Sequence, residues 1–347
     1  MQTSLLAWSN KNFSHLPWRH GRNLYTTLVS EIMLQQTTVS TVLGHYTRFL
    51  ERFPSIFELA QASEHDLMLA WKGLGYYRRA KNLLRAAQEI VQKYGGKIPL
   101  DYAELIQISG IGEYTANALL SIGAGHQAIS VDANLERVLA RYYGIDEFKG
   151  PKLQRKIYQL FEQGKILNKK TAWDFRNLNE SLMDLGRTLC QVRKAQCELC
   201  PVRSGCHAFK RGQALSYPKE MAGKKSGSKP LELKLLRVVI KHQDKVLVYQ
   251  KNSKEWLAGQ FEIPTFIIST ADCSLNQYPK VPDLKVKLSE LPQYKTAITK
   301  YKITNYVLSL KKNEFEKMFG YARPLQYLSA KKGQANLSTS TYKALLV

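Results

Sequence analysis

The sequence is poor in acidic residues, and it has no long apolar stretch. Its 51 lysines and arginines stand against 28 aspartates and glutamates, so the formal net charge is +23. Such an imbalance is typical of proteins that bind a polyanion, most often nucleic acid. An anionic membrane is the rival partner, but no apolar run approaches the length of a membrane-spanning helix. We therefore expect a DNA- or RNA-binding protein without membrane contact.

The first residues lack the features of an export signal. The stretch MQTSLLAWSNKNF has neither a basic start nor a continuous apolar core. We therefore expect a cytoplasmic location, associated with the nucleoid if the partner is DNA. Cysteine is also scarce, and five thiols in a reducing compartment are not expected to form a disulfide framework.

Four of the five cysteines nevertheless fall in one short segment. They are spaced C-x6-C-x2-C-x5-C between Cys190 and Cys206. Four thiols are the ligand number of a zinc site or of an iron–sulfur cluster. The thiol count alone leaves the choice of metal open.

Chain length and the changing residue pattern along the chain predict two domains joined by a linker. With 347 residues and 44% apolar content, the chain is long enough for two cores. Residues 1–210 show helical periodicity, residues 211–231 are rich in Lys, Gly, Ser and Pro, and residues 232–347 show strand-like alternation. We expect a helical domain, a linker and a smaller α+β domain.

Some elements are predicted individually. Apolar periodicity predicts one helix from Asn23 to Leu43 and another from Arg79 to Tyr94. Alternation predicts strands at 236–240, 245–250, 284–288 and 300–311.

Two glycines mark the stretch around which the helical domain is organised. Gly110 and Gly112 flank Ile111, and we expect both to adopt φ > 0 in a tight hairpin between two helices. The free N–H groups at the start of the helix that carries Tyr114 would then suit a DNA phosphate. Asp132 follows, directly before another apolar-periodic helix. An Asp at such a place is ordinarily a helix N-cap.

Glu31 interrupts an apolar group within the first predicted helix. Its ordinary interpretation is a glutamate on the solvent face. The alternative is a carboxyl held against an apolar wall, where burial raises the pKa and makes it a general acid near neutral pH. Glu180, by itself, is interpreted as a surface residue.

The hairpin followed by V-D-x-N resembles the helix-hairpin-helix DNA glycosylase superfamily. Further motifs resemble the MutY family of adenine DNA glycosylases. These motifs are LPWR at 16–19, SEIMLQQT at 30–37, GLGYY at 73–77, the four-cysteine spacing, and WLAGQFEIP at 256–264. The last run is similar to the family's Nudix-like domain, but no cluster of Nudix-box glutamates follows, so we expect no pyrophosphatase activity.

The resemblance implies an all-α helix-hairpin-helix glycosylase domain with an iron–sulfur loop, plus a Nudix-like α+β domain. It implies a [4Fe–4S] cluster held by Cys190, Cys197, Cys200 and Cys206. The implied activity is removal of adenine mispaired with 8-oxoguanine or guanine in double-stranded DNA, by a monomer, after base flipping.

The resemblance also assigns roles to individual residues. Glu31 would protonate the leaving adenine, and Asp132 would stabilise the oxocarbenium-like sugar, with support from Tyr114 and Asn134. Arg19 and Glu180 would contact the flipped adenine, and Gln35, Gln36 and Tyr76 would contact the duplex. Gly110 and Gly112 would contact the phosphate backbone, and Thr299 would contact the lesion. Thr299 belongs to Ile298-Thr299-Lys300, where the family commonly has Phe-Ser-His.

Three departures and two other functions accompany this hypothesis. The chain has Ala133 where the family often has Gly, Glu136 where it often has Lys, and Asn23-Leu24-Tyr25 where it has D-P-Y. A lyase needs an amine nucleophile where Tyr114 stands, which argues against an endonuclease III-like enzyme. A thymine–guanine mismatch glycosylase also has Tyr there and stays open. A non-enzymatic iron–sulfur DNA-binding protein would be expected to lack one carboxylate.

Overall fold

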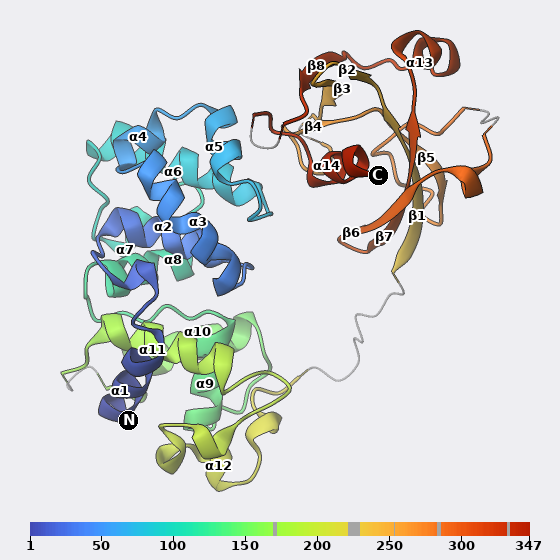
Figure 1. Ribbon diagram of the computed structural model, residues 1–347. Coiled ribbons are helices and arrows are strands. Elements are labelled where there is room, and N and C mark those ends of the chain that lie inside the picture. Colours follow the sequence, from blue (N-terminus) through green and yellow to red (C-terminus); the bar gives the residue numbers. More distant parts are fainter. Residues whose placement is uncertain (169–171, 221–229, 253, 283–285, 332–333) are drawn as a thin grey trace. The chain divides into compact units, whose positions relative to one another are not determined.

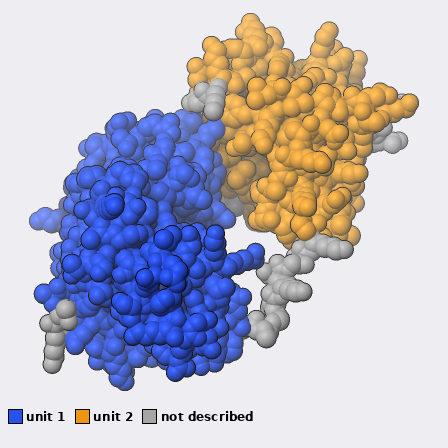
Figure 2. All heavy atoms as spheres, turned by 60° about the horizontal axis from the view of Figure 1, so that its bottom comes forward, with its two compact units in different colours: residues 1–223 blue, residues 224–347 orange. Residues whose placement is uncertain are grey.

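The computed structural model describes residues 1–168, 172–220, 230–252, 254–282, 286–331 and 334–347. The chain forms two compact units, Met1–Gly223 and Lys224–Val347 (Figure 2). The first unit is built of helices, and the second combines strands with helices (Figure 1). The expected fold class, an all-α domain followed by an α+β domain, is confirmed.

The helices of the first unit are mostly short and begin at polar caps such as Asn23, Ser63 and Asp101. Their bounds are α1 Gln2–Phe13, α2 Leu24–Leu34, α3 Val39–Arg52, α4 Ile56–Ala60, α5 Glu64–Ala70, α6 Arg78–Tyr94, α7 Tyr102–Leu105, α8 Glu113–Ala118, α9 Ala133–Tyr143, α10 Pro151–Glu162, α11 Phe175–Thr188 and α12 His207–Lys210.

The helix expected from Asn23 to Leu43 is two helices, so that prediction was wrong. Helix α2 ends at Leu34, because Gln36 adopts φ +54° and the chain turns there. Thr38 then caps α3 by accepting a hydrogen bond from the N–H of Thr41. The apolar pattern continues through the break, which is why periodicity alone did not show it.

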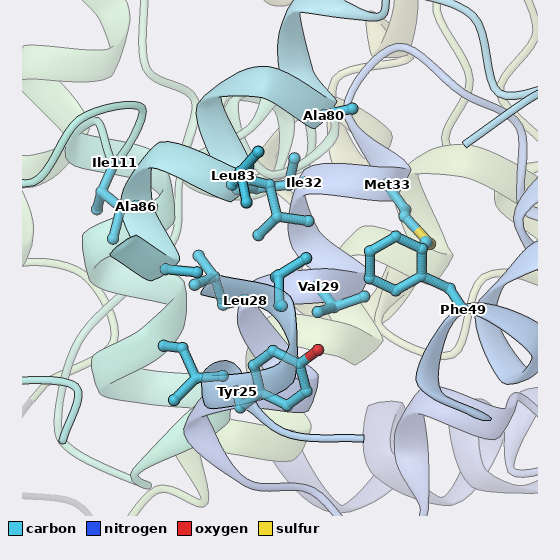
Figure 3. Close-up of a cluster of buried hydrophobic side chains, with 14 of the residues drawn as sticks. Tyr25, Leu28, Val29, Ile32, Met33, Phe49, Ala80, Leu83, Ala86 and Ile111 are labelled. Carbon is cyan, nitrogen blue, oxygen red and sulfur yellow. The ribbon is translucent and has the colours of Figure 1, made fainter. Parts of the chain in front are cut away.

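Helix α2 lies in the centre of an apolar cluster. Leu28, Val29 and Ile32 are buried against Phe49 of α3 and Leu83 of α6 (Figure 3). Burial of such side chains stabilises a fold by about 1.5–3 kcal/mol each. The helix that carries Glu31 is therefore fixed by packing on the side away from the solvent.

The glycine hairpin joins α7 to α8. Gly110 has φ +84°, and a Cβ there would lie 2.7 Å from Cβ of Asn82 on α6, so only glycine fits without a shift. Gly112 differs from the expectation. Its φ is −98°, in the extended region, because it is the N-cap residue of α8. Helix α8 continues as a short π-helix, Leu119–Gly123.

The stretch predicted as a linker, 211–231, is only partly described. Its first ten residues lie on the helical unit, where the O of Tyr217 accepts from Arg141 Nε at 2.9 Å and the O of Lys219 accepts from the N–H of Lys149 at 2.9 Å. Residues 221–229 lie outside the described residues, and the first strand begins at Leu231. The division between the two units falls inside the predicted stretch.

The second unit contains two sheets. One has the order β5-β1-β7-β6, with β1 and β7 parallel and the other pairs antiparallel; in the other, β3 pairs with β2, β4 and β8. The bounds are β1 Leu231–Val239, β2 Lys241–His242, β3 Lys245–Gln250, β4 Phe261–Glu262, β5 Thr265–Thr270, β6 Gln293–Ile298, β7 Tyr301–Ser309, β8 Gln326–Ser329, α13 Lys312–Met318 and α14 Thr339–Leu346. Three of the four predicted strands correspond to β1, β3 and β7. Of the fourth, 284–288, the first two residues lie outside the described residues, and residues 286–288 are not in a strand.

A buried ionic cluster holds the second unit together. Glu262, from the run that resembles the Nudix-like motif, accepts from Arg237 Nη1 at 2.7 Å and from Lys251 Nζ at 2.5 Å. All three side chains are almost fully buried. The cluster ties β4 to β1 and to the end of β3, so Glu262 has a structural part in this chain.

Candidate active site

Glu31 lies near the end of α2 and is buried, with 5% of its surface exposed. The hydroxyl of Tyr114, at the start of α8, donates a hydrogen bond to Glu31 Oε2. Burial raises the pKa of Glu31 to about 7, and the negative charges of Glu180 and Asp132 add to this rise, whereas the Tyr114 bond opposes it. The solvent-face interpretation of Glu31 is thus wrong, and the carboxyl can carry a proton near neutral pH.

Asp132 is the N-cap residue of α9 and is held by three donors. Its Oδ1 accepts from the N–H groups of Asn134 at 2.9 Å and Leu135 at 2.7 Å, and its Oδ2 accepts from Asn134 Nδ2 at 2.7 Å. Desolvation raises the pKa of this carboxyl, while these bonds favour its charged form. The ordinary N-cap interpretation is correct, and it does not exclude a catalytic role, because the cap fixes the carboxylate in place.

Arg137 holds the side-chain amide of Asn134 in place. Its Nη2 donates to Asn134 Oδ1 at 2.9 Å and to the O of Gly186 at 2.7 Å, and its Nε donates to the O of Cys190 at 2.7 Å. Gly186 lies so close that a Cβ would be 2.6 Å from Asn134 Cβ. This arginine is buried and was not found from the sequence, where it is one more basic residue on an amphipathic helix.

Glu180 is buried on α11, so its interpretation as a surface residue was wrong. Its Oε2 accepts from Arg22 Nη2 at 2.6 Å and lies 3.8 Å from Arg19 Nε. Arg19 also pairs with Asp184 on the next turn of α11. The Nε atoms of Arg19 and Arg22 are buried without a hydrogen-bond partner among the described residues. Sequence reasoning missed Arg22, although it lies only three residues after Arg19.

The residues expected to probe a duplex lie in two neighbouring loops. Gln36 is exposed in the loop between α2 and α3, and Tyr76 is 61% exposed in the loop before α6. Both adopt positive φ. Gln35, in contrast, is half-buried, and its Nε2 donates to Thr115 Oγ1 at 3.3 Å. Gln35 therefore contacts α8, and the freely exposed side chains are Gln36 and Tyr76.

The four clustered cysteines line one hollow, together with residues such as Arg141 and Phe209. All four are free and half-buried, and Arg141 Nη1 donates to Cys190 Sγ at 3.2 Å. In the described part of the chain, no three Cys, His, Asp or Glu side chains gather closely enough to hold one metal ion. A hollow lined by four thiols is compatible with a cluster of several atoms, whereas a single zinc needs its ligands about 2.0–2.3 Å from the ion.

Thr299 lies at the tip of the hairpin between β6 and β7, in the second unit. It is exposed and adopts φ +48°, which is unusual for a β-branched residue. Its neighbour Lys300 is not a free charge, because Lys300 Nζ lies 2.8 Å from Asp272 Oδ2. The hydroxyl of Tyr301 donates to the same Asp272 oxygen. The hairpin is thus anchored to the 271–274 segment.

The described residues contain no helix that is both long and apolar enough to cross a bilayer.

The candidate site consists of three carboxyl side chains of the helical unit: a buried Glu31 that can be protonated, an Asp132 that caps a helix, and a Glu180 that is paired with arginines.

Comparison with known proteins agrees with this arrangement. Residues 29–163 match the family described as HhH-GPD superfamily base excision DNA repair protein. A solved structure, a thermostable thymine-DNA glycosylase, superposes with a TM-score of 0.51 at 27% identity, over 60% of this chain and 94% of that one. The fold and site thus define a helical base excision DNA repair glycosylase.

Curated relatives identify the family within this class of DNA repair glycosylases. Adenine DNA glycosylase of Buchnera aphidicola subsp. Schizaphis graminum is 34% identical over 264 residues, which is 76% of this chain and 74% of that protein. Human adenine DNA glycosylase is 36% identical over 218 residues, 60% of this chain and 39% of that protein. This chain belongs to the adenine DNA glycosylase family. It is therefore an enzyme that hydrolyses N-glycosyl bonds, which excludes the non-enzymatic alternative.

The similarity reaches beyond the helical unit. The 264 residues matched in the Buchnera relative exceed the 223 residues of that unit, so the match includes part of the α+β unit.

Proposed function

We propose that this enzyme removes adenine mispaired with 8-oxoguanine or guanine in double-stranded DNA. The observation that carries the proposal is the buried Glu31, whose pKa is raised to about 7 and whose carboxyl accepts from Tyr114. Adenine is a poor leaving group until a ring nitrogen is protonated, so the reaction needs an acid that keeps its proton near neutral pH. Glu31 supplies that proton.

Asp132 has the complementary task. Loss of the base leaves positive charge on the sugar, and a fixed carboxylate stabilises that charge in the transition state. The hydrogen bonds from Asn134 and from the N–H of Leu135 favour the charged form of Asp132, against the desolvation that raises its pKa. Water then completes the hydrolysis, because Tyr114 stands where a lyase would need an amine.

The recognition of adenine rests on Glu180 and two arginines. Adenine offers donors at its amino group and acceptors at its ring nitrogens. Glu180 supplies an acceptor, and the Nε–H groups of Arg19 and Arg22, which make no hydrogen bond among the described residues, supply donors. The base must leave the duplex stack to reach them. Gln36 and Tyr76 contact the duplex that the base leaves. Gln35 does not reach the duplex in this proposal, because its side chain is hydrogen-bonded to Thr115 of α8.

The resident cofactor in this proposal is a [4Fe–4S] cluster held by Cys190, Cys197, Cys200 and Cys206. The four thiols that line one hollow and the Arg141 contact to Cys190 Sγ support it. When bound, the cluster would cross-link the loop that carries these cysteines and hold it on α9. No step of base release passes through it.

The lesion opposite adenine is read, in this proposal, by the hairpin around Thr299. The Thr299 hydroxyl is exposed at the tip and can bond the altered ring edge of 8-oxoguanine. The enzyme acts as a monomer, since Glu31, Tyr114, Asp132 and Glu180 all come from one helical unit.

The test is single-turnover base release from duplexes carrying A:8-oxoguanine, A:G, T:G or A:T. We expect fast release of adenine from the first two and slow or no release from the others. The second candidate is a thymine–guanine mismatch glycosylase, which the similarity to the thymine-DNA glycosylase structure favours. Release of thymine from T:G without release of adenine from A:8-oxoguanine would establish that alternative.

A further inference from the structure

One arginine joins the two loops that carry Gln36 and Tyr76. Arg79 lies in the first turn of α6, and its guanidinium extends toward the end of α2. It donates to the end of α2 and to both loops. In α2 the acceptors are the O of Ile32 at 2.8 Å and the O of Met33 at 2.8 Å; in the loops they are the O of Gln35, Thr37 Oγ1 at 2.8 Å, the O of Leu74 at 3.1 Å and the O of Gly75 at 3.4 Å.

Two of these acceptors directly precede residues with unusual backbone conformations. The O of Gln35 belongs to the peptide before Gln36, which has φ +54°, and the O of Gly75 belongs to the peptide before Tyr76, which has φ +45°. Non-glycine residues rarely adopt such angles, and they keep them only where surrounding groups fix the backbone. Arg79 fixes both peptides at once.

The guanidinium is itself fixed by the core. It lies 5.6 Å from the ring centre of Trp71 and 5.5 Å from that of Tyr76. Trp71 is fully buried, and its Nε1 donates to the O of Gly75 at 3.1 Å. A planar fork with five donors can hold carbonyls on two sides, whereas the single ammonium of a lysine cannot reach both loops.

We propose that Arg79 is the positioning residue for mismatch recognition. It holds Gln36 and Tyr76 in the conformations with which they enter the duplex, and it does so without contacting DNA. Discrimination between a mismatched and a paired adenine therefore depends on a side chain outside the reaction centre. This inference rests on the proposed function only in taking Gln36 and Tyr76 as the duplex contacts.

The central test is Arg79→Lys in the full-length enzyme. We expect its affinity for A:8-oxoguanine duplex to fall on the order of 10²-fold, as misplaced contacts do. Its affinity for fully paired DNA and its single-turnover rate at saturating enzyme should change far less. The matched control is Arg85→Lys on the exposed face of the same helix. Equal discrimination in the two variants would overturn the proposal.

A double-mutant comparison separates positioning from general stability. In a Gln36→Ala/Tyr76→Ala background, Arg79→Lys should cause little further loss of mismatch affinity, because the residues it positions are gone. A full additional loss would show that Arg79 acts elsewhere.

A measurement on the free protein makes the inference independent of catalysis. Hydrogen exchange of residues 35–37 and 73–77 should speed up in Arg79→Lys and stay unchanged in Arg85→Lys. If the wild-type enzyme releases no adenine, the proposed function is wrong, and the exchange experiment still decides the role of Arg79. Unchanged exchange in both loops would overturn that role.

Discussion

At the scale of single residues, the two candidate catalytic carboxyls differ in what surrounds them. Glu31 receives one hydroxyl donor and is otherwise buried, so it favours its protonated form. Asp132 receives three N–H donors from Asn134 and Leu135, which favour the charged form. On the proposed function, these surroundings suit Glu31 to the role of acid and Asp132, although desolvation raises its pKa too, to that of electrostatic stabiliser.

Removing either carboxyl should stop the reaction. We expect Glu31→Gln and Asp132→Asn to abolish base release, since a general acid alone is worth about 10²–10⁴-fold. Both amides keep the size of the side chain, so binding of the mismatched duplex should persist. Single-turnover release and duplex affinity would be measured side by side. Normal turnover by either variant would contradict the assignment.

The raised pKa of Glu31 also has a consequence for stability. Its ordinary pKa is 4.5 and its folded value is about 7, so the folded protein binds this proton more tightly than the unfolded chain. Stability that depends on the proton is complete below about 4.5 and is lost as pH rises through about 7. Above pH 7 the fold must bury a charge, and Glu31→Gln relieves that cost.

We therefore expect Glu31→Gln to be more stable than wild type at pH 8, by up to roughly 3 kcal/mol, and nearly equal to it at pH 4.5. Denaturant unfolding at both pH values measures this. The exposed Glu51→Gln controls for the loss of one negative charge. A stability difference that does not change with pH would show that Glu31 is not buried as described.

At the scale of elements, the sequence predicted which helices and strands exist better than where they end. Helix α6, which ends at the left-handed Gly95, and strands β1, β3 and β7 were predicted because apolar periodicity, a terminal glycine and alternation are local signals. The break after Leu34 was not, because Gln36 carries no local sign of its positive φ. That conformation is fixed by Arg79, which lies more than forty residues away in sequence.

The same limit applies to the candidate site. Glu31 and Asp132 could be named from motifs, but the burial of Glu180 and its contact with Arg22 arise only when α11 packs beside the chain segment before α2. Gly112 shows the converse, since a glycine pattern suggested a positive φ that the capping position does not use.

The β6–β7 hairpin yields a prediction of its own. Thr299 combines an exposed hydroxyl with a positive φ, which costs an L-residue about 1–2 kcal/mol. Thr299→Ala and Thr299→Gly both remove the hydroxyl, so both should lose preference for 8-oxoguanine over guanine. Only glycine relieves the backbone, so Thr299→Gly should be roughly 1 kcal/mol more stable than Thr299→Ala.

Relative single-turnover rates on A:8-oxoguanine and A:G, together with unfolding curves, test both parts. Wild-type preference in both variants would show that this hairpin does not read the lesion. Equal stability of the two would contradict the observed φ.

At the scale of the whole molecule, the loop that carries the four cysteines is the segment for which the structure adds most to the sequence. The spacing left zinc and an iron–sulfur cluster open, and the four thiols that line one hollow are compatible with the cluster proposed here. Arg137 and Arg141 attach this loop to α9 through the O of Cys190 and the O of Gln191.

We accordingly expect the purified protein to be brown, with about four irons per chain. Cys200→Ser should lose iron, whereas the exposed Cys273→Ser should keep it. Metal analysis and the visible absorption spectrum would be compared for the three proteins. A colourless protein with one zinc per chain would overturn the cluster assignment.

Arg137 connects this loop to the chemistry. One guanidinium holds both the main chain of Cys190 and the amide of Asn134, which in turn holds Asp132. With the proposed cluster bound, the loop would be more rigid, and Arg137 and Asn134 would hold Asp132 more firmly in place. On the proposed function and with the proposed cluster, a cell starved of iron would make an enzyme whose aspartate lacks part of its support, and we would expect mutations from oxidised guanine to accumulate there although the gene is intact.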